Sequence, residues 1–225
     1  SQSKGSTRMV VAIDGPAGTG KSTISQKVAQ KAGFFYLNSG RFYRAITWKN
    51  LMQGKGLDQT QALIATAADI DISIDQDRFL VDGVERASEL HTEQVDATVA
   101  AVSAIPEIRI AVNNRIKRIA GERDIVVEGR DMSTVVFPNA DVKVFLDAAA
   151  EVRARRRMDQ VGNGTIDEIR RAIEERDRID RGKRIGALRR SEDAVYIDTT
   201  DLTIDQVCER VIAIIHEKNQ HGRSS

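Results

Sequence analysis

The sequence predicts an α/β protein in which a five-stranded parallel sheet is covered by helices on both faces. Short runs rich in Val, Ile, Phe and Tyr alternate along the 225 residues with longer segments of helical periodicity. A glycine-rich loop follows the first run and leads into a helical segment, the order that a phosphate-binding βα unit requires. Strands separated by helices pair in parallel, because parallel neighbours need a crossover connection.

The segments with strand composition are residues 9–13, 34–37, 125–127, 142–146 and 195–197. Each is a short apolar run bounded by polar or glycine residues, as expected for strands buried on both faces. In open α/β sheets, ligands bind beyond the carboxyl ends of the strands. The polar residues after three of these runs, at 38–40, 128–131 and 147, are therefore expected to share one edge of the sheet with the glycine-rich loop.

The glycine-rich loop carries the motif G-x-x-x-x-G-K-[ST]. Its residues are Gly15, Pro16, Ala17, Gly18, Thr19, Gly20, Lys21 and Ser22, and Thr23 begins a helix-like segment. The glycines let backbone N–H groups converge on phosphate oxygens at a helix N-terminus. Lys21 can reach the β- and γ-phosphates, and the Ser22 hydroxyl can ligate Mg²⁺. The loop predicts a site for a nucleoside triphosphate with Mg²⁺.

Two segments interrupt the strand–helix alternation. Residues 70–81 alternate apolar and polar side chains around the turn Asp75-Gln76-Asp77, which predicts an antiparallel hairpin in an insert at about residues 57–104. Residues 151–190 are rich in arginine, and Gly162-Asn163-Gly164 separates two helical arms. A lid of this kind neutralises phosphate charge and excludes water. For any single arginine, a solvated surface ion pair is the alternative.

We expect one domain over residues 9–225, with a core at 9–56, 105–150 and 191–217. Residues 1–8 are polar and lack an initiator methionine, so we expect a disordered lead there. The tail from Lys218 onward is also expected to be disordered. Thr203 and Gln206 predict the start of the last helix, and Cys208 lies on its apolar face as a buried thiol.

The composition is ordinary for a soluble globular protein. Hydrophobic residues make up 41 %, charged residues 30 %, and the formal net charge is +1. This charge favours neither nucleic acid nor an anionic membrane, and no apolar run reaches the length of a membrane span. The single cysteine excludes an internal disulfide and suits the reducing cytoplasm. We therefore expect a cytoplasmic monomer that binds no nucleic acid and no membrane.

Charged residues near the strand ends indicate a second anion site. Arg44 and Arg41 share a helix face just after residues 38–40, and Arg130 and Asp131 follow the third strand. A guanidinium pairs with phosphate oxygens, and a carboxylate accepts a hydrogen bond from an exocyclic amine. A phosphate acceptor is already anionic at neutral pH and needs no general base. The pattern favours phosphoryl transfer between two anionic substrates, with a local Arg130–Asp131 ion pair as the structural alternative.

Three strings, together with the arginine-rich segment that ends near Asp180, make the chain similar to bacterial cytidylate kinases, members of the superfamily of P-loop nucleoside monophosphate kinases. They are the glycine loop, Ser39-Gly40-Arg41-Phe42-Tyr43-Arg44, and Glu128-Gly129-Arg130-Asp131-Met132-Ser133-Thr134-Val135-Val136-Phe137-Pro138. The resemblance covers about residues 10–216. It implies a three-layer P-loop kinase fold with a nucleoside-monophosphate-binding insert and a helical lid. It also implies transfer of the γ-phosphoryl group of ATP, with Mg²⁺, to CMP or dCMP, giving CDP or dCDP.

On the acceptor side, the resemblance implies roles for residues that match the family motifs. Ser39, Arg109 and Asp131 would contact the cytosine. Arg44 and Arg130 would bind the phosphate of CMP. These assignments come from the family and not from the spacing of the residues.

On the lid, the resemblance assigns two groups of residues. Arg176 and Asp180 would reach the ribose or phosphate of the acceptor, and Lys183 stands where the family usually has an arginine for that phosphate. Arg153 and Arg157 resemble lid arginines that flank ATP. The expected catalytic set is Lys21, Arg130, Arg153 and Arg157.

The chain departs from the family pattern at Asn38, His91, Ala100, Ser133 and Lys183. Ala100 removes a possible hydrogen bond to the base, and Lys183 supplies charge without the two-pronged guanidinium fork. A kinase for UMP or another small acceptor therefore stays open as an alternative, as does a non-catalytic nucleotide-binding module. A GTPase switch would carry an Asn-Lys-x-Asp string, which the sequence lacks.

Overall fold

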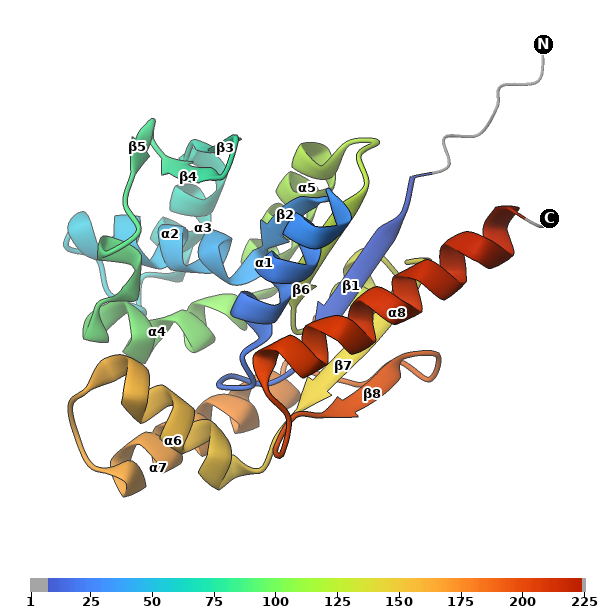
Figure 1. Cartoon of the computed structure of the whole chain (residues 1–225). Coiled ribbons are helices and arrows are strands. Elements are labelled where there is room, and N and C mark those ends of the chain that lie inside the picture. Colours follow the sequence, from blue (N-terminus) through green and yellow to red (C-terminus); the bar gives the residue numbers. More distant parts are fainter. Residues whose placement is uncertain (1–7, 224–225) are drawn as a thin grey trace, which may run out of the picture.

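A computed structural model describes residues 8–223, and its centre is a five-stranded parallel sheet (Figure 1). The strands lie in the order β2-β6-β1-β7-β8. Their bounds are β1 Val10–Asp14, β2 Phe35–Asn38, β6 Ile125–Gly129, β7 Val142–Asp147 and β8 Val195–Asp198. All neighbours pair in parallel, so the predicted fold class is confirmed and the carboxyl ends meet at one edge. The expected lead at residues 1–8 lies outside the described residues, except for Arg8.

Helices cover both faces of the sheet because consecutive side chains of the central strands are apolar and point to opposite faces. The covering helices are α1 (Lys21–Ala32), α2 (Ser39–Met52), α5 (Pro106–Ala120) and α8 (Ile204–Arg223). On β1, Val11 and Ile13 pack in a core with α1 and α8. Val10 and Ala12 face the opposite core, which α2 and α5 complete. The result is the expected three-layer arrangement (Figure 1).

Between α2 and α5 the chain forms a second, antiparallel sheet of three strands. The strands of this sheet are β3 (Ile72–Asp75), β4 (Arg78–Val81) and β5 (Val84–Glu85). The same part of the chain also forms the helix α3 (Thr60–Asp69), the short 3-10 helix η1 (Glu89–His91) and the helix α4 (Glu93–Ser103). The predicted hairpin is present as β3–β4, with Gln76 at φ 55° in its turn. Asp82 and Gly83, both at positive φ, then lead into β5, so the hairpin is extended by a third strand.

Two further helices, α6 (Ala150–Val161) and α7 (Ile166–Arg181), lie together beyond the carboxyl edge of the sheet (Figure 1). Thr165 caps α7 by accepting from the Glu168 N–H, and the Glu168 side chain accepts from the Thr165 N–H. The arginines divide between two sides. Exposed members are Arg155, Arg170, Arg171, Arg178 and Arg181, whereas Arg153, Arg156, Arg157 and Arg176 are at least half-buried.

The last helix is longer than the sequence analysis expected. The prediction of disorder from Lys218 is wrong as far as Arg223, because Glu217, Lys218 and Gln220 are good helix formers and neither glycine nor proline interrupts the helix before Gly222. Residues 224–225 lie outside the described part. Cys208 is fully buried on the apolar face of α8, as predicted. No helix within residues 8–223 is long and apolar enough to cross a membrane.

Candidate active site

The glycine loop connects β1 to α1 at the carboxyl edge of the sheet. At Gly15, a Cβ atom would overlap the backbone carbonyl oxygen of Leu146 on β7. Gly18 has φ 81°, and a Cβ there would lie 2.9 Å from the Cβ of Arg153. Gly20, at φ 80°, caps the N-terminus of α1. This close, left-handed path is open only to glycine, so the glycine positions of the motif follow from the packing.

The loop offers a run of hydrogen-bond donors to an anion. The backbone N–H groups from Ala17 to Ser22 donate no hydrogen bond to any residue that the structure describes. Lys21 is buried, and no described carboxylate lies within salt-bridge distance of it. Burial, and secondarily the charge of Arg130, lower the pKa of Lys21 to about 7. Free N–H groups at a helix N-terminus beside an unpaired lysine fit a polyphosphate group.

Glu128, near the end of β6, organises the adjoining hydroxyl groups. Its buried carboxylate accepts a hydrogen bond from Ser22 Oγ at 2.7 Å and from the Tyr36 hydroxyl at 2.6 Å. Mg²⁺ is bound in phosphate sites by few protein oxygens, with waters and phosphates completing its shell. A hydroxyl and a carboxylate beside the phosphate-binding loop therefore fit this metal.

Asp180 on α7 gathers three of the predicted cations. Arg130 Nε lies 3.0 Å from Oδ2, Lys183 Nζ lies 2.7 Å from Oδ1, and Arg176 Nε lies 3.9 Å from Oδ2. Burial raises the pKa of Asp180, but the three cations outweigh burial and hold the pKa below its usual range. Burial lowers the pKa of Lys183 to about 8 and that of Arg176 to about 10. Three cations around one carboxylate leave an excess of positive charge that suits an anionic ligand.

Arg44 and Arg157 meet at a different carboxylate, that of Asp96 on α4. Arg44 Nη1 lies 2.5 Å from Asp96 Oδ1, and Arg157 Nη2 lies 2.7 Å from Oδ2. Arg41, expected to share a face with Arg44, instead lies over the ring of Tyr36 at 5.7 Å. Of the two arginines on this face of α2, only Arg44 contacts Asp96, and Arg41 contacts Tyr36.

Arg109 and Asp131 form a fully buried ion pair of 2.7 Å. The Arg109 guanidinium also lies 5.0 Å from the ring centre of Tyr43. Apart from Asp131 Oδ1, which is held by Arg109 in the ion pair, three polar atoms of this group are buried without a hydrogen-bond partner, namely Arg109 Nε, Asp131 Oδ2 and the Tyr43 hydroxyl. Gly186 closes over the pair, and a Cβ there would lie 2.5 Å from Asp131 Oδ2. Unsatisfied donors and acceptors in one place fit a polar, planar ligand.

Ser39 and Asp14 fix the backbone around this group. Ser39 begins α2, and its Oγ packs so closely against Gly129 that a Cβ there would overlap it. Asp14, at the end of β1, accepts from the N–H of Met132 at 2.9 Å and from the N–H and hydroxyl of Ser133 at 2.8 and 2.6 Å. These bonds hold the turn η2 (Met132–Val136), which directly follows Asp131.

Two arginines of α6 hold the lid helices against the rest of the site. Arg153 donates to the Ala17 carbonyl at 3.2 Å and pairs with Asp177 at 2.7 Å. Arg156, which had no predicted role, donates to the carbonyl of Thr199 at 2.7 Å. Arg153 is thus tied to the glycine loop and to α7, whereas Arg157 is directed toward α4.

Sequence reasoning assigned no role to Glu128, Tyr36 or Asp96. Their partners lie far along the chain: Ser22 and Glu128 are 106 residues apart, and Asp96 is 61 residues from Arg157. The one available signal was the position of Glu128 at a strand end, immediately before Gly129-Arg130-Asp131. Asp96 lies with Glu93 in the first turn of α4, where acidic residues are common for their effect on the helix alone.

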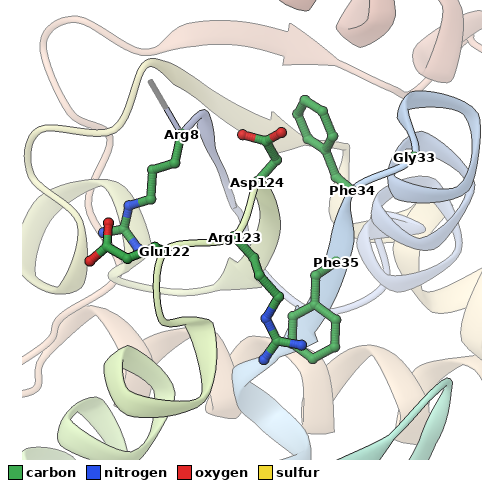
Figure 2. Close-up of a pocket in the computed structure, with 7 residues that line it drawn as sticks. All are labelled: Arg8, Gly33, Phe34, Phe35, Glu122, Arg123 and Asp124. Carbon is green, nitrogen blue, oxygen red and sulfur yellow. The ribbon is translucent and has the colours of Figure 1, made fainter. Parts of the chain in front are cut away.

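Of two cavities of about 590 and 270 Å³, the larger lies away from these contacts, whereas the smaller is lined by Tyr36 and Arg41 beside Glu128. Figure 2 shows the larger one, where the start of β2 meets the loop before β6. Its lining residues are Arg8, Gly33, Phe34, Phe35, Glu122, Arg123 and Asp124. The Arg123 guanidinium stacks over Phe35 at 3.7 Å, and Asp124 accepts from the Met9 N–H at 2.7 Å. Arg41 is the one residue considered for the second anion site that lines either cavity, and neither cavity contains Lys21, Arg44, Arg130 or Asp131, so contacts and not an open cavity identify the candidate site.

Comparisons with known proteins agree with this arrangement. A family model described as cytidylate kinase matches residues 11–217. The cytidylate kinase of Streptomyces avermitilis is 41 % identical over 216 residues, which cover 93 % of this chain and 94 % of that protein. The cytidylate kinase of Caldanaerobacter subterraneus subsp. tengcongensis is also 41 % identical, with 94 % and 96 % covered. An uncharacterized protein from Eubacterium ventriosum, at 16 % identity, shares the fold with a TM-score of 0.53 and 94 % and 99 % coverage. The chain belongs to the cytidylate kinase family.

Proposed function

We propose that this protein transfers the γ-phosphoryl group of ATP to CMP or dCMP and so produces CDP or dCDP. The observation that carries the proposal is the juxtaposition of two anion sites. Lys21, beside the free N–H groups of the glycine loop, lies within electrostatic reach of Arg130 and Arg176 at the Asp180 cluster. A donor and an acceptor phosphate would therefore bind next to each other. The curated relatives that match along nearly their full length are cytidylate kinases.

On the donor side, residues 15–23 hold the triphosphate of ATP. The backbone N–H groups donate to its oxygens, and Lys21 neutralises charge between the β- and γ-phosphates. Ser22 and Glu128 are the residues that would hold Mg²⁺. The bound metal supplies further neutralisation of the phosphate charge. Tyr36 keeps the Glu128 carboxylate oriented through its hydrogen bond.

On the acceptor side, Ser39, Arg109 and Asp131 contact the cytosine. The unpartnered atoms of Arg109 and Asp131 supply one donor and one acceptor for a base. Arg44 and Arg130 bind the phosphate of the acceptor. A base that leaves these buried polar atoms unpaired is disfavoured, which makes this pair the source of selectivity.

The lid, residues 151–190, completes the site. Arg176, Asp180 and Lys183 approach the ribose and phosphate of the acceptor from α7 and the segment after it. Arg157 neutralises charge on the transferred group, and Arg153 positions α6 against the glycine loop. An oxygen of the acceptor phosphate attacks the γ-phosphorus in line with the leaving ADP, and no general base is needed. The closed lid excludes water, which would otherwise compete as the acceptor.

An acceptor panel tests the proposal directly. Purified protein with ATP and Mg²⁺ is given CMP, dCMP, UMP, AMP or GMP, and ADP release is measured. We expect the highest kcat/KM for CMP or dCMP. A preference for UMP would favour the alternative pyrimidine acceptor, and ADP release at background with every acceptor would reject the kinase assignment.

A substitution of Asp131, the carboxylate proposed to contact the cytosine, tests the acceptor side of the site separately from the donor side. Asp131→Asn removes the charge that pairs with Arg109 while it preserves the shape of the side chain. We expect kcat/KM for CMP to fall by about 10²-fold, as when a buried polar contact to a substrate is lost. The Kd for ATP, measured without acceptor, should change by less than about twofold. If the affinity for ATP fell as much as kcat/KM for CMP, the proposed contact of Asp131 with the cytosine would be contradicted.

A further inference from the structure

We propose that Asp96 on α4 is an internal substitute for the acceptor phosphate, which holds Arg44 and Arg157 until a phosphate displaces it. The proposal rests on the proposed function, because that function assigns the acceptor phosphate to Arg44. Asp96 contacts neither substrate after displacement and is therefore a positioning residue.

The geometry of Asp96 resembles that of a phosphate bound between two arginines. One carboxylate oxygen faces Arg44 at 2.5 Å, and the other faces Arg157 at 2.7 Å. Separate oxygens of one anion thus engage guanidinium groups from separate elements, as phosphate oxygens do. Arg44 belongs to α2 and Arg157 belongs to α6. Asp96 on α4 therefore links α2 to the lid helix α6.

The Asp96 contact is more open to water than the other ion pairs of the site. The Asp96 side chain is 26 % exposed and that of Arg157 is 32 % exposed, against 2 % for Asp180 and 12 % for Asp177, while Arg44, the second partner of Asp96, is 10 % exposed. Breaking a fully buried pair leaves an uncompensated charge in the interior and is strongly unfavourable. A partly exposed carboxylate costs less to release, because water reaches it, and the buried Arg44 then requires another anion in its place.

The surroundings of Asp96 favour a stronger anion. His91 and Arg176 both interact electrostatically with Asp96 and with Arg44. The other hydrogen bond of Arg44 goes to the neutral carbonyl of Leu90, and Arg157 has no second partner among the described residues. A carboxylate brings a single negative charge, whereas a phosphate monoester carries about −1.5 to −2 at neutral pH. A phosphate that enters this group of cations therefore displaces the carboxylate.

The displacement predicts the direction in which phosphate affinity changes when the charge of Asp96 is removed, and an ordinary structural ion pair predicts a different direction. If Asp96 competes with phosphate, loss of its charge strengthens phosphate binding. If Asp96 only fixes the position of Arg44, loss of its charge weakens phosphate binding or leaves it unchanged. The direction of the effect separates the two cases.

The test compares Asp96→Asn with the native protein. Asparagine keeps the shape and one acceptor oxygen but removes the charge. Binding of inorganic phosphate and of CMP is measured by calorimetry without ATP. We expect both Kd values to fall about fivefold, which corresponds to about 1 kcal/mol for the loss of a partly exposed ion pair. Asp96→Glu should restore the native values. Glu89→Gln, which breaks the Arg86 pair on the same segment, is the control and should change neither Kd.

An unchanged or raised Kd for phosphate in a folded Asp96→Asn protein overturns the proposal. Should that variant fail to fold, Asp96→Ser removes the same charge and gives the same comparison. Inorganic phosphate keeps the test separate from the proposed function. Normal CMP phosphorylation without a gain in phosphate affinity rejects the displacement alone, whereas a gain in a protein that phosphorylates no nucleotide rejects the function alone.

Discussion

At the scale of single residues, Lys21 combines burial with the lack of an anionic partner among residues 8–223. With its pKa lowered to about 7, the side chain is largely neutral at pH 8. Bound phosphates favour the charged form, so the pKa rises when ATP binds. We expect ATP binding at pH 8 to take up about one proton. Calorimetry in buffers of different ionisation enthalpy measures this uptake.

Two comparisons check that the proton belongs to Lys21. At pH 6 the side chain is already charged, so its contribution to proton uptake should be small. Lys21→Met should lose the uptake at pH 8 even where binding remains measurable. Equal uptake by the native and variant proteins would show that another group takes the proton.

Tyr36 offers a second test at the residue scale, through the carboxylate that it orients. Tyr36→Phe removes the 2.6 Å hydrogen bond to Glu128 and leaves the ring in place. Loss of such a partner typically weakens metal affinity 10- to 100-fold, so we expect about a tenfold rise in the Mg²⁺ concentration for half-maximal activity. Tyr196→Phe is the matched control, because that hydroxyl bonds to the exposed edge of Asp147. An unchanged Mg²⁺ dependence would contradict the role of Tyr36.

The placement of site residues was predictable where a local string dictates it, whereas their roles stay predictions. Lys21 and Ser22 follow from the glycine loop, because its spacing sets both the turn and the start of the helix. Glu128 and Asp96 could not be assigned, since their roles depend on partners brought close only by the fold. Arg153 was predicted to flank ATP, and its contacts with Ala17 and Asp177 depend on how α6 packs, which local sequence does not encode.

At the scale of elements, Arg153 joins α6 to α7 and to the glycine loop. Arg153→Lys keeps the charge but cannot reproduce separate hydrogen bonds to the Ala17 and Ala148 carbonyls and to Asp177. We expect a loss of about 2 kcal/mol in the free energy of unfolding, or roughly 4–8 °C in Tm. Thermal unfolding measures the loss. Arg155→Lys, at an exposed neighbouring position, should leave Tm unchanged, and equal effects of both variants would rule out the joining role.

The elements themselves were largely predictable because hydrophobic periodicity controls them. All five parallel strands and the two helical arms follow from apolar runs and from the glycines between the arms. The strand β5 was missed because Val84–Glu85 is too short to show a period, and both of its residues are exposed. The end of α8 was misplaced because a polar tail can continue a helix whose earlier turns are anchored by apolar packing.

At the scale of the whole molecule, the core helix α8 and the lid helices α6 and α7 differ in the kind of side chain that packs them against the rest of the protein. The helix α8 is anchored by buried apolar residues, among them Val207, Val211 and Ile215. On α6 and α7, most of the buried side chains are charged, and the apolar ones are Ala154 and Ile173. A unit held mainly by ion pairs opens more readily than one held by apolar packing. The core, the insert and the lid are therefore expected to differ in local stability.

Amide hydrogen exchange tests this difference and its link to the substrates. Without nucleotides, we expect residues 150–181 to exchange much faster than β1 and β6, whose strands are buried on both faces. CMP together with a non-hydrolysable ATP analogue should slow exchange in residues 150–181, because two sets of phosphates then fill the space between lid arginines and the glycine loop. Either nucleotide alone should slow it less. Protection confined to the glycine loop, with residues 150–181 unchanged, would show that these helices do not close over the substrates.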